Sequence, residues 1–208
     1  MTDRIGLIFE GDSEFNSFRH LLPQLRSQTG HTFLNPLKAD IQPKSPYGRI
    51  VSSCKSQIKW LTMQRATRII VSFDREDHSD CPGTWSNKLS SDFSSKYGVS
   101  VSVVLKDRTF ENWLIADLEA FDSMSSRFSI PSSSRMRICP NKADQVDGYM
   151  EICKLVNGSY SKVSDSVKIL SHANILRMSE HSRSFRRLLR ILEHPSYLHQ
   201  SKRPHNSL

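Results

Sequence analysis

The fold is decided by the stretch Ile5-Gly6-Leu7-Ile8-Phe9-Glu10-Gly11-Asp12-Ser13-Glu14. Its apolar run ends at a carboxylate and a glycine, which predicts a buried strand of parallel type followed by a tight turn. Apolar side chains then recur at helical spacing, so we expect an amphipathic helix that begins near Asp12 or Ser13. The apolar positions of that helix are Phe15, Phe18, Leu21, Leu22 and Leu25.

Glu10 follows this first strand directly. In open α/β sheets ligands bind just beyond the carboxyl ends of the strands, so Glu10 stands where chemistry would occur. A plainer interpretation is that Glu10 and Glu14 only place negative charge at a helix N-terminus, where the helix dipole favours it.

Strand and helix patterns alternate along the next hundred residues. We expect further strands at residues 31–34, 68–73 and 99–105, and helices at residues 47–61, 85–93 and 111–121. This alternation predicts an α/β fold with a mostly parallel sheet flanked by helices. The predicted α/β domain covers residues 1–122.

A serine-rich segment, residues 123–134, marks a mobile loop or a subdomain boundary. Beyond it the pattern is helical, with helices expected within residues 146–156, 167–176 and 185–192. We expect residues 123–208 to form a basic helical extension that packs on the same domain.

Composition limits the class of protein. A chain of 208 residues with 37% hydrophobic residues can form one folded domain. It contains no apolar run of the roughly 20 residues that a membrane-spanning helix needs, and its N-terminus has no signal-peptide core. The four cysteines form no CxxC pair, which is typical of a reducing compartment, so we expect a cytoplasmic protein.

The net charge of +8 is unevenly distributed. Residues 1–125 hold 15 basic and 15 acidic side chains, whereas residues 126–208 hold 14 and 6. A basic half joined to an acidic motif suits a polyanionic partner such as nucleic acid, although a basic soluble domain without that role has the same composition. The candidate phosphate contacts are Lys142, Lys168, Arg186 and Arg187, each of which can equally belong to a solvated helix face.

Acidic side chains follow three of the expected strands. They are Glu10, the cluster between Asp74 and Asp80, and Glu111. Parallel strands bring such positions together, and crowded carboxylates are most easily held by a cation. Carboxylate oxygens favour Mg²⁺ or Mn²⁺, which can activate water for phosphodiester cleavage. The alternative is ordinary ion pairing of these acids with Arg75, Lys106 and Arg108.

Other site types lack their motifs. The sequence has no Gly-x-Gly-x-x-Gly and no Gly-x-x-x-x-Gly-Lys-Ser/Thr, so we expect no nucleotide cofactor. It also has no Gly-x-Ser-x-Gly nucleophile turn. His78 and Cys81 lack a second pair at the spacing that a zinc site needs.

Three segments together resemble a known family. They are Glu10-Gly11-x-x-Glu14 after a strand, the Asp-rich turn that begins at Asp74, and Phe110-Glu111-Asn112-Trp113-Leu114-Ile115-Ala116-Asp117. The chain resembles Toprim-type domains over residues 5–121 and, more narrowly, the Toprim-like DUF4276 proteins, which are associated with bacterial anti-phage and abortive-infection systems. A weaker similarity continues at residues 182–187.

The resemblance implies a nuclease that depends on Mg²⁺ or Mn²⁺ and cleaves DNA or RNA. Toprim domains hold metal with a strand-end glutamate and an Asp-x-Asp pair, which correspond here to Glu10 and Asp74. Glu76 replaces the second aspartate, with Asp77 beside it as the alternative ligand, so the geometry of a second metal site departs from the family pattern. Glu14 and Glu111 would support the site.

The resemblance also implies a partner. Toprim-like proteins are often paired with an ABC-type ATPase, so we expect a separately encoded ATPase that docks on the helical extension around residues 185–192. The competing hypothesis is a non-catalytic module that binds nucleic acid or a partner and retains a vestigial acidic site.

Overall fold

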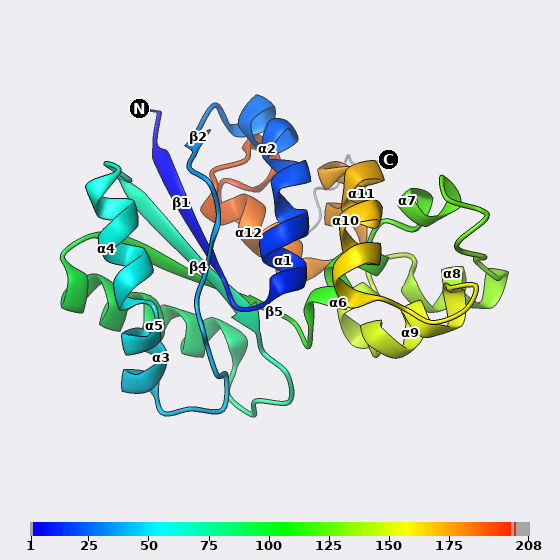
Figure 1. The fold of residues 1–208 in the computed structure, drawn as a ribbon, viewed down its shortest axis with the longest axis horizontal. Coiled ribbons are helices and arrows are strands. Elements are labelled where there is room, and N and C mark those ends of the chain that lie inside the picture. Colours follow the sequence, from blue (N-terminus) through cyan, green and yellow to red (C-terminus); the bar gives the residue numbers. More distant parts are fainter. Residues whose placement is uncertain (1, 201, 203–208) are drawn as a thin grey trace.

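The computed structural model describes residues 2–200 and 202, and its centre is a parallel β-sheet. The strands are β1 (Arg4–Phe9), β2 (Thr32–Phe33), β3 (Leu37–Lys38), β4 (Arg68–Asp74) and β5 (Ser100–Lys106). Their order is β2-β1-β4-β5, and β3 also pairs with β1, beyond β2 along the same edge (Figure 1). Every one of these pairings is parallel, which confirms the predicted fold class.

Helices cover both faces of the sheet. One face packs against α3 (Tyr47–Ser53), α4 (Lys55–Met63) and α5 (Pro82–Tyr97). The close approach of α4 explains Gly6 in β1, because a Cβ atom there would lie 2.7 Å from the Leu61 side chain. The other face packs against α1 (Asp12–Ser17), α2 (Leu22–Thr29), α6 (Phe110–Ile115) and α12 (Arg183–Ile191).

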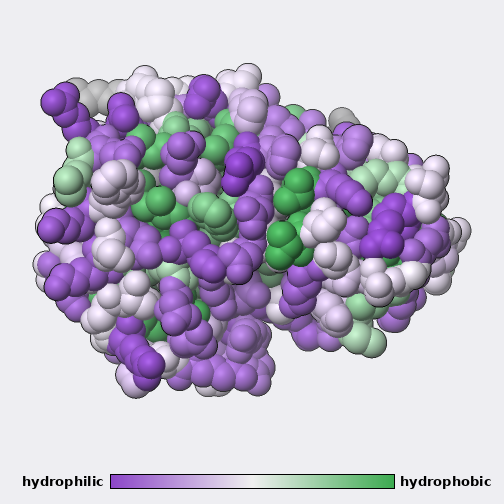
Figure 2. Space-filling view, viewed as in Figure 1, coloured by the Kyte–Doolittle hydropathy of each residue, from purple (hydrophilic) through white to green (hydrophobic). Residues whose placement is uncertain are grey.

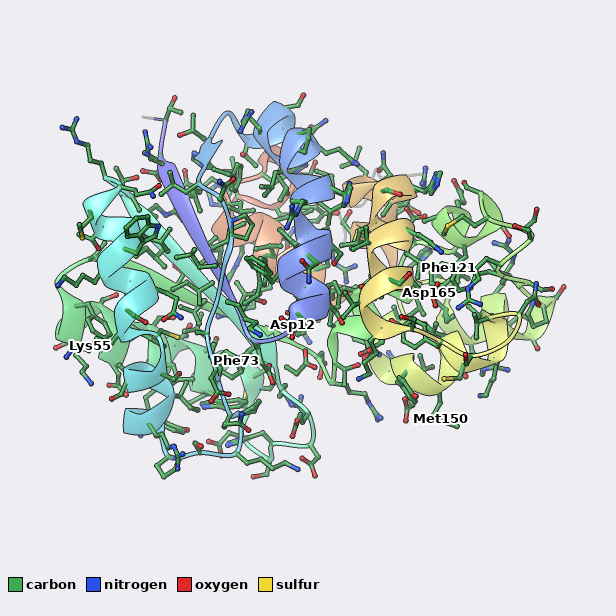
Figure 3. All side chains as sticks on the ribbon, viewed as in Figure 1. Asp12, Lys55, Phe73, Phe121, Met150 and Asp165 are labelled. Carbon is green, nitrogen blue, oxygen red and sulfur yellow. The ribbon has the colours of Figure 1, made fainter. Side chains whose placement is uncertain are left out.

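The second half of the chain is helical. Its elements are α7 (Leu118–Asp122), α8 (Ser132–Ile138), α9 (Gly148–Leu155), α10 (Lys162–His172) and α11 (Ile175–His181), followed by α12. One hydrophobic cluster joins Ile5 and Leu7 of the sheet to residues as distant as Phe128 and Leu189. Phe121 and Asp165 mark this helical part in Figure 3, on the far side of α1 from α4. Residues 201 and 203–208 of the predicted extension lie outside the described residues.

Several predicted helices are interrupted. The helix expected from Asp12 to Leu25 is α1, a 3-10 turn (Phe18–Leu21) and α2, because Pro23 in the first turn of α2 lacks the N–H that a continuous helix would bond to the preceding turn. The helix expected at residues 47–61 breaks at Cys54, and the helix expected at 111–121 breaks at Asp117. The serine-rich segment, predicted as a loop, contains the start of α8 at Ser132.

Among the described residues, no helix is long and apolar enough to cross a bilayer. Figure 2 shows that the face seen in Figure 1 is mostly hydrophilic, with hydrophobic atoms in small separate patches.

Candidate functional site at the sheet switch point

Glu10 and Asp74 meet where the chain changes direction across the sheet. From β1 the chain moves outward to β2 on one side, and it later returns to place β4 on the other side. Position 10 directly follows β1, and Asp74 is the last residue of β4. The backbone N–H of Asp74 donates to Glu10 Oε2 across 2.8 Å. This is the topological switch point, the place where open α/β sheets bind ligands.

Lys106 lies beside Asp74. It ends β5 and pairs in register with Asp74, so the two side chains are neighbours. Its ammonium is completely buried, donates to Glu14 Oε1 and lies 3.1 Å from Asp74 Oδ1. The contact with Asp74 is an ion pair without hydrogen-bond alignment. We call Glu10, Glu14, Asp74 and Lys106 the switch-point cluster.

Glu14 holds the turn that follows β1. Its second oxygen, Oε2, accepts the backbone N–H of Gly11 at 3.0 Å, as in a capping box at the start of α1. Both oxygens of the buried Glu14 carboxylate are therefore engaged by protein donors. Figure 3 shows Asp12, next to this turn, at the start of α1 between the sheet and the helical part.

Burial and mutual repulsion raise the pKa values of the acids in the switch-point cluster. Burial, opposed by Lys106 and reinforced by Asp74, raises the pKa of Glu10 to about 7. Burial likewise raises the pKa values of Glu14 and Asp74. Burial opposes the charge on Lys106, but the three carboxylates hold the pKa of Lys106 above its ordinary value. Three carboxyl groups thus face one ammonium, and their raised pKa values mean that ionising all three requires more positive charge than Lys106 alone supplies.

These residues fit one divalent cation. The described part of the chain has no group of three or more His, Cys, Asp or Glu side chains arranged as a metal cage. Mg²⁺ seldom needs such a cage, because it usually keeps several waters and binds one or two carboxylates together with substrate phosphate. Glu10 and Asp74 supply two carboxylates, whereas the oxygens of Glu14 are already used.

Glu76 and Asp77 face a different partner. Their carboxylates lie 3.3 and 3.1 Å from Lys44 Nζ, in the turn after β4, and the Asp77 side chain is 80% exposed. Glu76 has a left-handed backbone, with φ of 53°, which turns it away from the line of β4. Its charge still contributes to raising the pKa of Glu10, so Glu76 borders the switch-point cluster.

Glu111 borders the cluster from the other side. It is buried near the start of α6, 3.3 Å from Lys162 Nζ, and its charge contributes to raising the pKa of Asp74. The alternative of ordinary ion pairs is met in part, since Lys106 pairs with Asp74, whereas Arg75 pairs with Asp107, which is not one of the predicted acids.

Two of the four candidate phosphate contacts are exposed, and two are not. Lys142 and Lys168 lie on the surface. Arg186 is 2% exposed and donates to the Ser179 carbonyl and to Asn141 Oδ1, which corrects the expectation that it meets phosphate at the surface. Arg187 is half-buried and donates to Ser86 and Asn87 of α5.

The segment expected to dock an ATPase is largely internal. The apolar side chains of α12 pack in the hydrophobic cluster beside β5, so this face is not available to a partner (Figure 1). The buried residues are Phe185, Leu188, Leu189 and Leu192. Of the basic side chains of the same helix, Arg183 is exposed, Arg187 and Arg190 are half-buried, and Arg186 is buried.

Comparison with known proteins assigns a family. No curated protein and no solved structure matches the chain. A family model described as "Domain of unknown function (DUF4276)" matches residues 9–193, which include every member of the switch-point cluster. The chain therefore belongs to the DUF4276 family.

Proposed function

We propose that this protein is a divalent-cation-dependent nuclease, a hydrolase of phosphodiester bonds in DNA or RNA. The observation that carries the proposal is the meeting of Glu10 and Asp74 at the switch point, around the buried ammonium of Lys106. An excess of carboxylates at this position of an open sheet suits a cation and the phosphate that the cation would attract.

In this proposal each side chain of the switch-point cluster has its own role. Glu10 and Asp74 hold the cation, while Lys106 fixes the positions of Glu14 and Asp74 from the interior. Glu14 fixes the turn that carries Glu10 through its bond to Gly11. Mg²⁺ or Mn²⁺ in this place supplies Lewis-acid stabilisation and a water of lowered pKa. Glu76 and Glu111 stand at the borders of the cluster, where they add negative charge.

The test is cleavage by the pure protein. Plasmid, single-stranded DNA and total RNA are incubated with Mg²⁺, Mn²⁺ or EDTA. We expect cation-dependent cleavage that falls more than about 100-fold in Glu10→Gln and Asp74→Asn, because metal catalysis supplies several kcal/mol. Asp77→Asn is the matched control, since its carboxylate is exposed and paired with Lys44. Cleavage that persists in EDTA, or in both variants, contradicts the proposal.

A non-catalytic module is the second candidate. The observation that favours it is Lys106 itself, because a buried ammonium neutralises part of the acidic charge without any metal. In that case the protein binds nucleic acid equally well in Mg²⁺ and in EDTA, and no substrate is cut.

For the biological setting, we propose an effector of anti-phage defence that acts in the cytoplasm with a separately encoded ABC-type ATPase. Support comes from the family resemblance and from the lack of a nucleotide-binding loop in the sequence. A neighbouring reading frame with a Walker-type loop, whose product co-purifies with this chain, is the expected finding. High, specific nuclease activity of the isolated protein without such a neighbour contradicts the partnership.

A further inference from the structure

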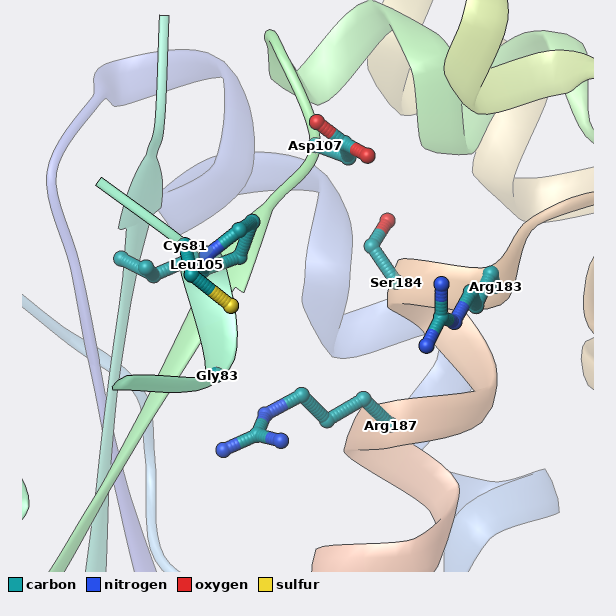
Figure 4. A pocket seen from close by; sticks show the side chains of 8 residues that line it. Cys81, Gly83, Leu105, Asp107, Arg183, Ser184 and Arg187 are labelled. Carbon is teal, nitrogen blue, oxygen red and sulfur yellow. The ribbon is translucent and has the colours of Figure 1, made fainter. Parts of the chain in front are cut away.

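A pocket lies outside the switch-point cluster, between α5, the end of β5 and the start of α12 (Figure 4). Its volume is about 210 Å³. Ligand pockets for drug-sized molecules usually reach 300–1,000 Å³, so this one suits a small group. Cys81 lines it from the position just before α5, Gly83 from α5, Asp107 from the loop after β5, and Arg183 and Arg187 from α12.

The pocket carries positive charge that the protein leaves largely uncompensated. Within residues 2–200, neither Arg183 nor Arg187 forms an ion pair with a carboxylate. Asp107 is the acidic residue of the lining, and Arg75 pairs with it at 3.1 Å. Figure 4 shows both α12 guanidinium groups extending from the helix toward the space beside Gly83.

Arg187 has a donor to spare. Its Nη2 donates to Ser86 Oγ and to Asn87 Oδ1, whereas its Nη1 forms no hydrogen bond within residues 2–200 and is not closed off from solvent. A guanidinium group prefers an oxyanion as the acceptor for its free N–H groups. Burial lowers the pKa of Arg187, and the positive charges of Arg190 and Arg183 lower it further. An anion beside Arg187 would stabilise its charged form.

The first turn of α5 adds to this field. The helix has 16 residues, and Pro82 and Gly83 begin it beside the pocket. Its N-terminal N–H groups and dipole favour negative charge. The same N–H groups, chiefly those of Thr84 and Gly83, lower the pKa of the exposed Cys81 thiol.

We propose that this pocket binds a phosphate dianion, either free inorganic phosphate or the terminal phosphate of a nucleic acid strand. Two guanidinium groups match a dianion better than the single charge of an internal phosphodiester. The volume of about 210 Å³ is ample for one phosphoryl group. The proposal is independent of the switch-point cluster and of any cleavage there.

Cys81 provides the readout. Its alkylation by iodoacetamide is followed by peptide mass spectrometry in EDTA, with Cys153 on α9 as the internal reference. Inorganic phosphate is added at constant ionic strength, with chloride as the balancing anion. We expect saturable slowing at Cys81 of at least fivefold and no change at Cys153, because the bound dianion blocks the thiol and opposes its ionisation.

Variants connect this protection to the pocket. We expect Arg183→Gln and Arg187→Gln each to raise at least tenfold the phosphate concentration that gives half-maximal protection of Cys81. Arg26→Gln on α2 removes the same charge elsewhere, and we expect it to leave this concentration unchanged. Arg183 is exposed, so its variant remains informative if the half-buried Arg187 is needed for folding. Unchanged Cys81 alkylation in phosphate, or equal protection in Arg183→Gln, overturns the proposal.

Oligonucleotides distinguish the source of the phosphate. A 5′-phosphorylated single strand that protects Cys81, while its 5′-hydroxyl counterpart does not, supports a strand terminus as the ligand. Protection by inorganic phosphate and by neither oligonucleotide supports free phosphate. Equal protection by both oligonucleotides without protection by phosphate overturns the proposal, because the strand would then act by covering the surface.

Discussion

When no cation is bound, Lys106 supplies the positive charge of the switch-point cluster. A completely buried ammonium is stable only beside negative charge, and here Glu14 and Asp74 contact it directly. The same contacts keep two crowded carboxylates in place. Lys106 is therefore a positioning residue, whereas Glu10 and Asp74 retain oxygens for other partners.

Replacing Lys106 tests this role. In Lys106→Met, two buried carboxylates lose their counter-charge, so we expect the free energy of unfolding in EDTA at neutral pH to fall by about 3–5 kcal/mol. The double variant Lys106→Met with Glu14→Gln should recover part of the loss, because fewer charges remain unpaired. Urea denaturation measures both. A single variant as stable as the wild type would show that Lys106 does not hold the cluster.

Glu10 makes stability depend on pH. The pKa of Glu10 in the folded protein, about 7, exceeds its ordinary value of 4.5. The stability that the protonated carboxyl group contributes is therefore fully present below pH 4.5 and is lost as pH rises to about 7. Glu10→Gln keeps an acceptor for the Asp74 N–H and removes this loss. Without metal, we expect the free energy of unfolding of this variant to exceed that of the wild type by roughly 1–3 kcal/mol at pH 8 and to equal it near pH 4.5. Urea denaturation at the two pH values, with Asp77→Asn as control, provides the measurement; a difference that does not vary with pH contradicts it.

The sequence predicts the three acidic members of this cluster, Glu10, Asp74 and Glu14, but not the central place of Lys106 among them. Glu10 and Asp74 could be found because each follows a recognisable apolar strand. The sequence offers Lys106 only as an ordinary ion-pair partner, like Arg75 and Arg108, since a strand's last residue can point either way. Only the register that pairs it with Asp74 turns Lys106 inward, and register between distant strands is not visible in local spacing.

At the scale of elements, the apolar spacing predicted where helices lie but not where they break. The pattern from Trp113 to Phe121 continues through Asp117, yet the helix stops there. The Asp117 carboxylate accepts the N–H of Asn174 at 2.7 Å and pairs with Arg177 at the same distance. These partners are some 60 residues away, so no local signal could reveal the interruption.

The contact between α6 and α9 depends on a glycine. A Cβ atom at Gly148 would lie 2.6 Å from the backbone nitrogen of Asn112, directly behind Glu111. We expect Gly148→Ala to lower the free energy of unfolding by about 1–3 kcal/mol through this clash. Gly48→Ala is the matched control, because Gly48 has open space around it and alanine favours a helix by up to about 1 kcal/mol. Thermal unfolding compares the two; equal effects would mean that the α6–α9 packing tolerates a shift.

For the whole molecule, net charge overstates the basic surface of the second half. Arg127 pairs with Asp165, Arg137 with Glu151, and Arg177 with Asp117, so these guanidinium groups join helices to one another. The charge that remains for a polyanion is carried by exposed side chains such as Lys142 and Lys168. Composition predicted the amount of charge, but its allocation between ion pairs and surface depends on the tertiary fold.

Salt dependence tests whether that surface charge binds nucleic acid. Each phosphate contact releases counterions, so the affinity of the wild type should fall steeply as salt rises. We expect Lys142→Gln with Lys168→Gln to reduce the slope of log K against log salt by up to about two, if both lysines touch phosphate. Lys55→Gln with Lys59→Gln is the control, because it removes equal charge from α4 on the opposite face of the sheet. Fluorescence anisotropy in EDTA avoids cleavage during the titration. A wild-type slope near zero, or equal changes in both double variants, would mean that the net charge of +8 serves solubility rather than a defined interface.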